Sequence, residues 1–434
     1  MPISIGFFFN TMYNVVDSFF AGQISTSALA AMGISFPVFF IIIAISEGMA
    51  RGSTALMANA IGEKNEGKEA VLAGQMFSLL IFLAVGLIAV GLFAVEPLFQ
   101  LLGAENDYLL PATQYITPIF MGSVFFLLSS FSNAILVANG DGKTFGKVLI
   151  VGFFLNLVLD PWFLYGGFGL PAMGIAGIAW ATVSIQAASG LFLFFTAVKR
   201  GYLNLRKWGD FLPKWKIYGE ILTQGIPASF NMMTVAVGFF VINYFLQFYG
   251  KAAVAAFGIG TRIEQIALLP TIGLGAAIVA IVGQNNGAGE FRRVRECLVL
   301  SLKYGMVLIL VGSVLIYVFA RPLMDIFTDD PAVIELGVNF VRIMAFIEWV
   351  YVAIFICVGF LQAIKKPLYG LFEGLVRKVA LPILVLYWVV DVWHHDINWV
   401  WFGMAGVNLV MTIFTAFYTI WAVRKYLPEV TEAE

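Results

Sequence analysis

Long apolar runs alternate with short polar segments along the whole chain. Each run has roughly 20 residues or more, the length that a helix needs to cross about 30 Å of hydrocarbon. We expect twelve membrane-spanning helices, near residues 2–21, 28–60, 69–94, 111–138, 145–165, 174–198, 219–248, 252–285, 296–319, 332–364, 367–389 and 401–423. Several runs exceed the minimum length, so tilt or extension into water is expected. The pattern predicts an all-α integral membrane protein.

The loops between these runs give an orientation, because lysine and arginine gather on the cytoplasmic side of a membrane. Alternate loops and the C-terminus hold most of the basic residues outside the spans, and the intervening loops hold only Lys251 and Arg321. The first set is Lys64, Lys68, Lys143, Lys147, Lys199, Arg200, Arg206, Lys207, Lys214, Lys216, Arg292, Arg293, Arg295, Lys365, Lys366, Arg424 and Lys425. We therefore expect a multi-pass protein of the cell (cytoplasmic) membrane with both termini cytoplasmic.

An internal repeat underlies the twelve spans. Glycine and proline residues recur 225 residues apart, and "GIAG" at 174–177 recurs as "GMAG" at 403–406. The recurring pairs are Pro2 and Pro227, Gly33 and Gly258, Gly48 and Gly273, Gly62 and Gly287, and Pro97 and Pro322. Because each half has six spans, both halves enter the bilayer in the same direction, as in secondary transporters with parallel repeats. We expect an N-terminal lobe (1–198), a cytoplasmic linker (199–218), a C-terminal lobe (219–424) and a cytoplasmic tail (425–434).

Composition excludes several other classes of protein. With 61% hydrophobic and 12% charged residues and a mean hydropathy of +0.92, the chain is too apolar for a soluble domain. A net charge of −1 gives no indication of nucleic acid binding. Cys297 and Cys357 fall in apolar segments and are expected to be unpaired core residues, and His394 and His395 are expected in a solvated loop. The first span has no basic segment before it, so we expect no cleaved signal peptide, and a short cytosolic leader is expected before Met1.

One segment resembles a phosphate-binding loop and fails the pattern. "NGDGKT" at 139–144 ends correctly, but GxxxxGK[ST] needs a glycine where Val137 stands. The spans also offer no catalytic nucleophile or metal cluster. We therefore expect no enzyme and no cofactor, with energy supplied by an ion gradient or a partner.

Acidic residues inside spans are rare and usually face a cavity or a partner. Asp17 in span 1 and Asp160 in span 5 both lie about five residues before the extracellular end, roughly 8 Å deep at 1.5 Å per residue. Asn156 lies one helical turn from Asp160, and span 6 brings Thr182 to a depth of roughly 12 Å, within side-chain reach of the acids. These oxygens suit a hard cation such as Na⁺, and they suit a protonation site equally well. The structural alternatives are that Asp160 caps a helix broken at Pro161 and that Asp17 is a satisfied interfacial residue.

Other polar residues in the spans extend these interpretations. Asn10 and Tyr13 form one polar face with Asp17 and are candidates to line a substrate cavity. Tyr115 and Asn133 in span 4 are candidates to line the same cavity or to pack helices together. The acids of the second half have bases nearby, which favours structural ion pairs over ligand binding. These residues are Glu264, Glu348 and Glu373, with Arg262, Arg342 and Arg377.

The sequence resembles the multidrug and toxic compound extrusion (MATE) family over its whole length. The residues that carry the resemblance are "NVVDSFFAGQISTSALAAMGISFP" at 14–37, "NGDGKT" at 139–144, "NLVLDP" at 156–161, "GIAGIAWATV" at 174–183 and "AAFGIGTRIEQIALLP" at 255–270. Each is loose alone, but their order and spacing in a doubled six-span frame are specific.

This resemblance implies a V-shaped, two-lobed antiporter that exports organic cations against inward Na⁺ or H⁺. It implies a first-lobe cation site at Asp17, Asn156, Asp160 and Thr182. Span 7, from Asn231 to Phe248, has no acid where other branches of the family place a glutamate, which indicates the DinF-like branch. We expect a monomer in the lipid bilayer, with small organic cations as substrates.

Two other functions remain as alternatives. A flippase of lipid-linked precursors, from the same superfamily, would favour a basic cavity for pyrophosphate, whereas the first lobe offers two acids. A membrane channel belongs to a different class, and failure to transport uphill would favour it.

Overall fold

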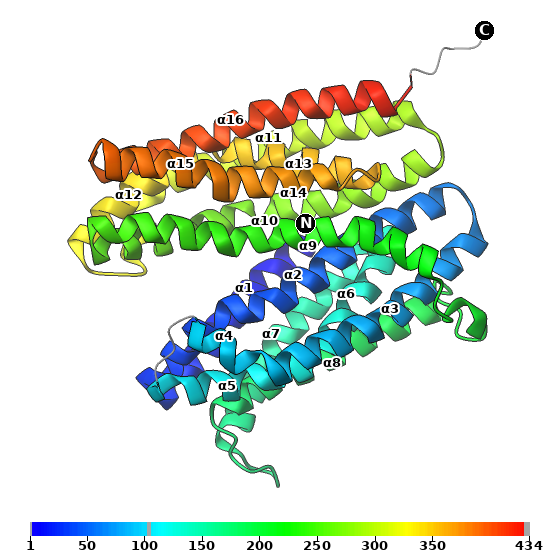
Figure 1. Ribbon diagram of the computed structural model, residues 1–434, viewed down its shortest axis with the longest axis horizontal. Helices are drawn as coiled ribbons and strands as arrows, with labels where there is room; N and C mark the ends of the chain where they lie inside the picture. Colours follow the sequence, from blue (N-terminus) through cyan, green and yellow to red (C-terminus); the bar gives the residue numbers. More distant parts are fainter. Residues whose placement is uncertain (1, 102–105, 429–434) are drawn as a thin grey trace. The chain divides into compact units, whose positions relative to one another are not determined.

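The computed structural model describes residues 2–101 and 106–428. Within these ranges the chain is helical almost throughout (Figure 1), and extended pairing is limited to one bridge between Gly167 and Leu170. Contacts divide the chain into two compact units, Met1–Ser229 and Phe230–Glu434. The prediction of an all-α protein is confirmed.

The helices follow the predicted spans in order. The first unit contains α1 (Pro2–Ile24), α2 (Thr26–Gly62), α3 (Glu66–Phe93), α4 (Val95–Leu101), α5 (Asn106–Met121), α6 (Ser123–Ala138), α7 (Gly142–Tyr165), α8 (Ile175–Lys199), η1 (Trp208–Asp210) and the start of α9 (Trp215–Leu246). The rest of α9 lies in the second unit, which continues with η2 (Gln247–Tyr249), α10 (Lys251–Gly287), α11 (Phe291–Asp325), α12 (Pro331–Ala345), α13 (Glu348–Ala363), α14 (Leu368–Leu375), η3 (Val376–Ala380), α15 (Leu381–Tyr387), η4 (Trp388–Val392) and α16 (Ile397–Tyr426).

In the described residues, ten of the twelve predicted spans are helices long and apolar enough to cross a membrane. Eight are single helices, and two are pairs of helices, α5 with α6 and α12 with α13. Helix α1 and the helical segment 368–392, which contains two π-helical stretches, account for the other two. The pairs bend by 47° and 52°. Both bends lie inside continuous apolar runs, so the sequence predicted each pair of helices as one unbroken span.

The two units repeat the same helical plan. Helices α2 and α10 each have 37 residues, and their bounds are 225 residues apart. Helices α6 and α13 each have 16 residues and keep the same offset. The plan differs in one place, because the first unit breaks after α3 and adds the short helix α4, whereas α11 continues through Pro322. Helix α4 was not predicted from the sequence.

Polar caps fix several helix starts. The Ser25 side chain accepts a hydrogen bond from the amide of Ala28 and begins α2, and Asn65 accepts from Lys68 and begins α3. Such caps satisfy backbone donors that the first turn of a helix leaves free.

The segment 139–144 is a helix junction. Gly140 adopts a φ of +86°, which suits glycine after the end of α6. Asp141 then caps α7, accepting from the amides of Lys143 and Thr144, and it pairs with Arg200 at the end of α8. Burial raises the pKa of Asp141, but hydrogen bonds from Thr144 and the charge of Arg200 outweigh burial and hold that pKa below its ordinary value. The resemblance to a phosphate-binding loop therefore has a structural explanation.

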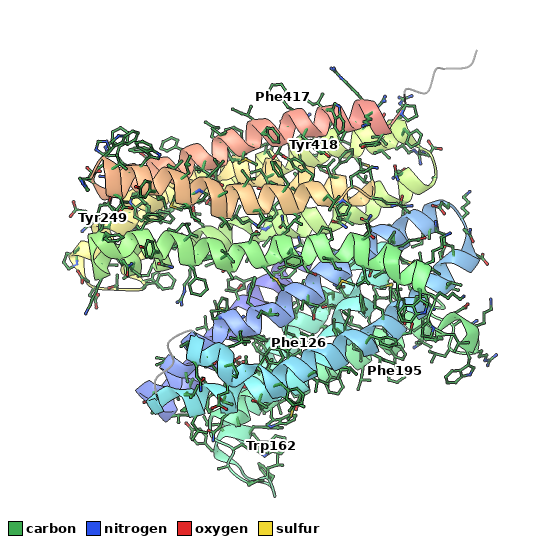
Figure 2. All side chains as sticks on the ribbon, in the orientation of Figure 1. Phe126, Trp162, Phe195, Tyr249, Phe417 and Tyr418 are labelled. Atoms are coloured by element: carbon green, nitrogen blue, oxygen red, sulfur yellow. The ribbon has the colours of Figure 1, made fainter. Side chains whose placement is uncertain are left out.

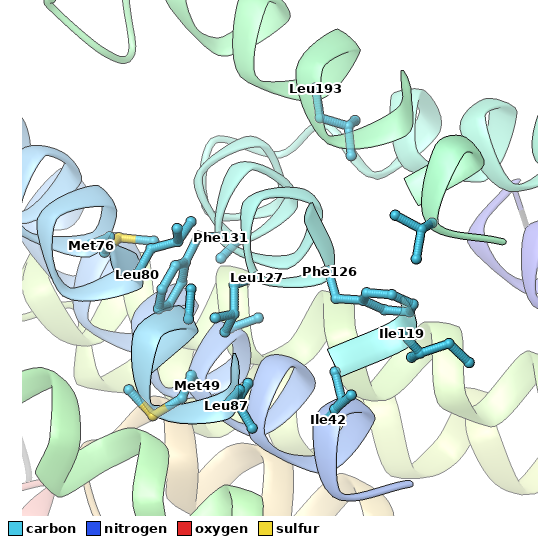
Figure 3. Close-up of a cluster of buried hydrophobic side chains, with 14 of the residues drawn as sticks. Ile42, Met49, Met76, Leu80, Leu87, Ile119, Phe126, Leu127, Phe131 and Leu193 are labelled. Carbon is cyan, nitrogen blue, oxygen red and sulfur yellow. The ribbon is translucent and has the colours of Figure 1, made fainter. Parts of the chain in front are cut away.

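Each unit has its own apolar core. In the first unit, α6 packs against α2, α3 and α8, and their side chains fill the space between them (Figure 3). Residues in this cluster include Ile42, Met49, Met76, Leu80, Phe126, Leu127, Phe131 and Leu193. In the second unit, the Phe340 ring lies 4.8 Å from the Trp401 ring, and Phe257 stacks on Trp401 at 6.3 Å. Both cores join helices that are distant in sequence.

Many large apolar side chains are exposed, as a lipid environment requires. Phe195 projects from α8 and Phe417 from α16 (Figure 2), with exposed fractions of 58% and 70%. In water such surfaces would be unfavourable, whereas lipid tails solvate them. Both cysteines are free thiols; Cys357 is a buried core residue as predicted, whereas Cys297 is only half-buried. His394 and His395 lie in the turn between η4 and α16.

Candidate functional site

The polar residues of the first unit meet where α1, α7 and α8 pack together. Gly6 of α1 permits close packing, because a Cβ there would lie 2.9 Å from the Cα of Gly146 in α7. On the other side, a Cβ on Gly177 of α8 would lie 2.5 Å from the carbonyl oxygen of Phe163. Small residues at both contacts let the helix backbones approach. As a result, Asp17, on α1, lies beside residues of α7 and α8.

Asn156 connects the two acids directly. Its Nδ2 donates one hydrogen bond of 2.8 Å to Oδ1 of Asp17 and another of 2.8 Å to Oδ1 of Asp160. All three side chains are buried, with Asn156 and Asp160 fully inaccessible. Only the amino group of an amide can donate to two carboxylates, so this orientation of Asn156 follows from its partners.

Thr182 completes the predicted group. Its hydroxyl donates to Oδ2 of Asp17 across 3.5 Å, a long hydrogen bond. The structure brings Asp17, Asn156, Asp160 and Thr182 together, and their role in binding a cation stays a prediction.

The buried Oδ1 of Asn156 lacks a hydrogen-bond partner among the described residues. The buried Tyr13 hydroxyl lies close to Thr182, and the carboxyl groups of Asp17 and Asp160 lie close enough together to interact directly. The ion pairs recorded in the described chain do not include either aspartate. Buried polar atoms without partners are rare in proteins. Here Oδ1 of Asn156 and the two acids mark a place where a proton or a cation could bind.

The structure argues against the capping alternative for Asp160. Helix α7 runs through Pro161 and ends only at Tyr165, so Asp160 lies inside the helix. Proline removes a backbone donor and thereby deprives the carbonyl of Leu157 of its helical partner. Such freed carbonyls are tolerated at membrane depth when other groups satisfy them.

The other predicted cavity residues divide into two groups. Tyr13 and Tyr115 are close enough to the two aspartates to interact electrostatically with them. Asn10 is exposed on α1, and Asn133 lies on α6. Among the described residues, neither of these asparagine side chains has a recorded hydrogen bond to the aspartates. Asn10 is three residues before Tyr13, and the polar stripe of α1 turns outward there.

In the second unit, one predicted ion pair is present. Arg377 pairs with Glu373 one turn away, and both side chains are buried. Arg377 also donates to Oδ1 of Asn408 at 2.9 Å and lies over the ring of Tyr351. Glu373 and Arg377 therefore form the structural pair that was expected.

The ion-pair prediction is wrong for the other acids and bases of the second unit. Glu264 and Glu348 are buried, and among the described residues neither has an ion pair. Glu348 instead accepts a hydrogen bond of 2.9 Å from Ser313. Arg262 is exposed, because it is two residues from Glu264 and points to the opposite side of α10. Arg342 is also exposed and lies over the Tyr317 ring.

Possible metal ligands are limited to hard oxygen donors. The described residues contain no group of three or more His, Cys, Asp or Glu side chains that could hold a metal. The site in the first unit has two carboxylates, one amide and one hydroxyl, a donor set that suits Na⁺ but not zinc or copper.

Sequence reasoning missed one polar residue with a clear role, Gln75 in α3. Its side chain is fully buried and holds the segment after α8 through three hydrogen bonds. The sequence feature that could have identified Gln75 is a glutamine inside an otherwise apolar span.

Comparisons with known proteins agree with the repeated helical plan and the buried acids, which together define a polytopic membrane transporter. The MatE family model matches twice, over residues 2–162 and 227–388. The chain belongs to the MatE family. The double match confirms the internal repeat, and membership of this transporter family confirms that the chain is not an enzyme.

Curated relatives are named as transporters. The chain is 30% identical over 388 residues to the FAD transporter of Shewanella oneidensis, covering 88% of this chain and 85% of the relative. It is 30% identical over 349 residues to the probable multidrug resistance protein NorM of Thermotoga maritima, covering 78% of this chain and 73% of the relative.

Solved structures match over nearly the whole chain. An outward-facing multidrug resistance MATE transporter of the MOP superfamily matches with a TM-score of 0.90 and 25% identity, covering 97% of this chain and 94% of that one. A MOP superfamily transporter from Pyrococcus furiosus, whose title describes reverse polarity of its binding pocket, matches with a TM-score of 0.89 and 26% identity, covering 98% and 95%. The chain is thus a multi-pass membrane transporter in a family whose substrates are small organic compounds.

Proposed function

We propose that this transporter exports organic cations in exchange for Na⁺ or H⁺ by alternating access. The observation that carries the proposal is the buried pair of Asp17 and Asp160, which share one amide and have no basic partner among the described residues. The coupling ion would bind at this pair, with Asn156 and Thr182 as further ligands if the ion is Na⁺.

Electrostatics supports this assignment. Two ionised carboxylates away from water repel each other, and removing each from water costs several kcal/mol. The amide of Asn156 donates hydrogen bonds but carries no net charge. A proton or a metal cation would supply the missing positive charge. The site therefore favours an occupied state, and it can couple occupancy to a change in helix packing.

The names of the relatives support two different substrate classes. NorM of Thermotoga maritima is named a multidrug resistance protein, which supports organic cations. The relative from Shewanella oneidensis is named a FAD transporter and is equally similar, so an anionic flavin nucleotide is the second candidate.

We further propose a monomer in the cell membrane with both termini cytoplasmic. The support for the orientation is the sequence distribution of lysine and arginine, because basic loops such as 199–218 favour the cytoplasmic side.

Transport by purified protein in vesicles tests the proposal. Ethidium and FAD would be offered separately, with a pH gradient and a Na⁺ gradient imposed one at a time. We expect uphill ethidium export with one of the gradients. Export of FAD alone would replace the substrate assignment, and purely downhill flux would favour a channel. Asp330→Asn is a matched control for aspartate-to-asparagine variants of the site, because it removes an exposed carboxylate and keeps a good helix cap.

A further inference from the structure

The segment 199–218, which we call the linker, is fastened to α3 by Gln75. The Gln75 amide donates to the carbonyl oxygens of Asp210 and Leu212 at 2.6 and 2.7 Å, and its oxygen accepts from the amide of Lys214 at 2.7 Å. Gly74 lets the backbone approach, because a Cβ there would lie 2.5 Å from the carbonyl oxygen of Asp210. These contacts fix the position of linker residues 210–214 along the axis of α3.

The length of α3 allows this position to lie at the edge of the hydrocarbon layer. Helix α3 has 28 residues, about 42 Å at 1.5 Å per residue, which exceeds a hydrocarbon core of about 30 Å by about 12 Å. Gln75 lies nine residues after Glu66, the first residue of α3, and thus about 14 Å from that end. If the excess length lies at this end, Gln75 holds the linker at the boundary between lipid tails and headgroups.

Aromatic side chains of the linker are exposed beside α3. The ring of Trp215 lies 6.5 Å from that of Phe82, an α3 residue that is exposed like its neighbours Ile81 and Val85. Trp208 is 79% exposed and Trp215 is 75% exposed. Tryptophan is enriched where membranes meet water, because its ring is apolar and its N–H is polar.

Positive charge surrounds these rings. The linker has six basic residues and one acid, Asp210. Arg200 is paired with Asp141 outside the linker. The other five are all exposed: Lys199, Arg206, Lys207, Lys214 and Lys216.

We propose that the linker binds anionic phospholipid headgroups, with Trp208 and Trp215 inserted among the lipids. Charge complementarity identifies the partner, because exposed Lys and Arg side chains next to two exposed tryptophans in the chain match the phosphate groups of a membrane surface. Each basic residue close to an anionic membrane surface raises binding by about fivefold. Screening lowers this effect, so removal of four charges should reduce the preference for anionic lipid by about tenfold or more.

Tryptophan quenching by brominated lipid in reconstituted full-length protein tests this proposal. Brominated phosphatidylglycerol should quench the Trp208 and Trp215 signal at a mole fraction about tenfold lower than brominated phosphatidylcholine does. The signal is assigned by comparison with the double variant Trp208→Phe, Trp215→Phe. The neutralised variant carries Arg206→Gln, Lys207→Gln, Lys214→Gln and Lys216→Gln, and it should lose the preference for phosphatidylglycerol.

A matched control removes four exposed charges elsewhere. It carries Lys64→Gln, Lys143→Gln, Lys147→Gln and Arg293→Gln, and it should keep the preference. Equal quenching by both lipids in the wild type, or an unchanged preference in the neutralised variant, would overturn the proposal. Loss of the preference in both four-charge variants would also overturn it, because net charge and not the linker would then select the lipid.

Discussion

At the scale of single residues, the position of the Asn156 amide has consequences for ion binding. Its amino group lies between Oδ1 of Asp17 and Oδ1 of Asp160, where it stabilises negative charge on both. A metal cation between the acids would need an oxygen there, so the amide would have to turn. A proton requires no such change. The geometry of the structure is thus compatible with a protonated pair, and Na⁺ would need a rearranged Asn156.

The first prediction concerns this pair. Asp17→Asn and Asp160→Asn should each abolish uphill export without changing membrane insertion, because one acid alone cannot bind and release the coupling ion. The double variant should be no worse than either single variant, since residues that act as a unit are not additive. Transport in vesicles measures the loss, and two partial losses that add together would contradict a shared site.

A second residue-scale prediction follows from the corrected ion pairs. Glu373→Gln should destabilise the protein by about 3 kcal/mol or more, because it leaves the buried Arg377 without its partner. Glu264→Gln should change stability much less, since Glu264 has no ion pair among the described residues and glutamine is nearly isosteric. Thermal unfolding in detergent measures both. A larger loss for Glu264→Gln would show that Glu264 has a charged partner.

At the scale of elements, the junction at Asp141 permits a prediction about pH. Asp141→Asn keeps the cap of α7 but removes the charge that pairs with Arg200. The pKa of Asp141 is lowered in the folded state, so its contribution is present above the unfolded pKa of about 3.9 and is lost as the pH falls below it. Because the pair is partly exposed, we expect about 1 kcal/mol or less.

Unfolding of wild type and Asp141→Asn at pH 7 and near pH 3 measures this difference. The wild type should be more stable at pH 7, and the gap should narrow as the pH falls through the lowered pKa of Asp141. Asp330→Asn is again the control, since Asp330 caps α12 and has no ion pair among the described residues. A gap that stays the same size in acid would mean that the charge of Asp141 is not its source.

The helices also show which features could be predicted from the sequence. Apolar length predicted α2 and α10 well, because a membrane span needs a long apolar run and little else. The bend at Gly122 was not predictable from hydropathy. A Cβ at Gly122 would lie 2.5 Å from the Val183 side chain, so the bend depends on tertiary packing. The spacing of Asn156 and Asp160 was visible within one helix, whereas the hydrogen bond from Asn156 to Asp17 required knowledge of how α1 packs on α7.

At the scale of the whole molecule, the repeat is more regular in structure than in sequence. Helices α6 and α13 begin and end 225 residues apart, yet the residues that begin them are Ser123 and Glu348. The first unit joins two buried acids through one amide. The second pairs Glu373 with Arg377 and also buries Glu264 and Glu348, which have no ion pair among the described residues. The duplicated frame has thus acquired two different polar interiors, and the shared amide is what distinguishes the acids of the first unit.

Ion and substrate binding should therefore be coupled across the molecule. If a cation at Asp17 and Asp160 stabilises a state with lower affinity for substrate, linkage requires that substrate weaken cation binding by the same factor. We expect ethidium affinity in detergent to fall by about tenfold as pH is lowered or Na⁺ is raised, a typical coupling of about 1.4 kcal/mol. Asp17→Asn should remove the response to the ion, and Asp330→Asn should keep it. Wild-type affinity that ignores both ions would contradict the scheme, because an ion that binds both states equally cannot shift their populations.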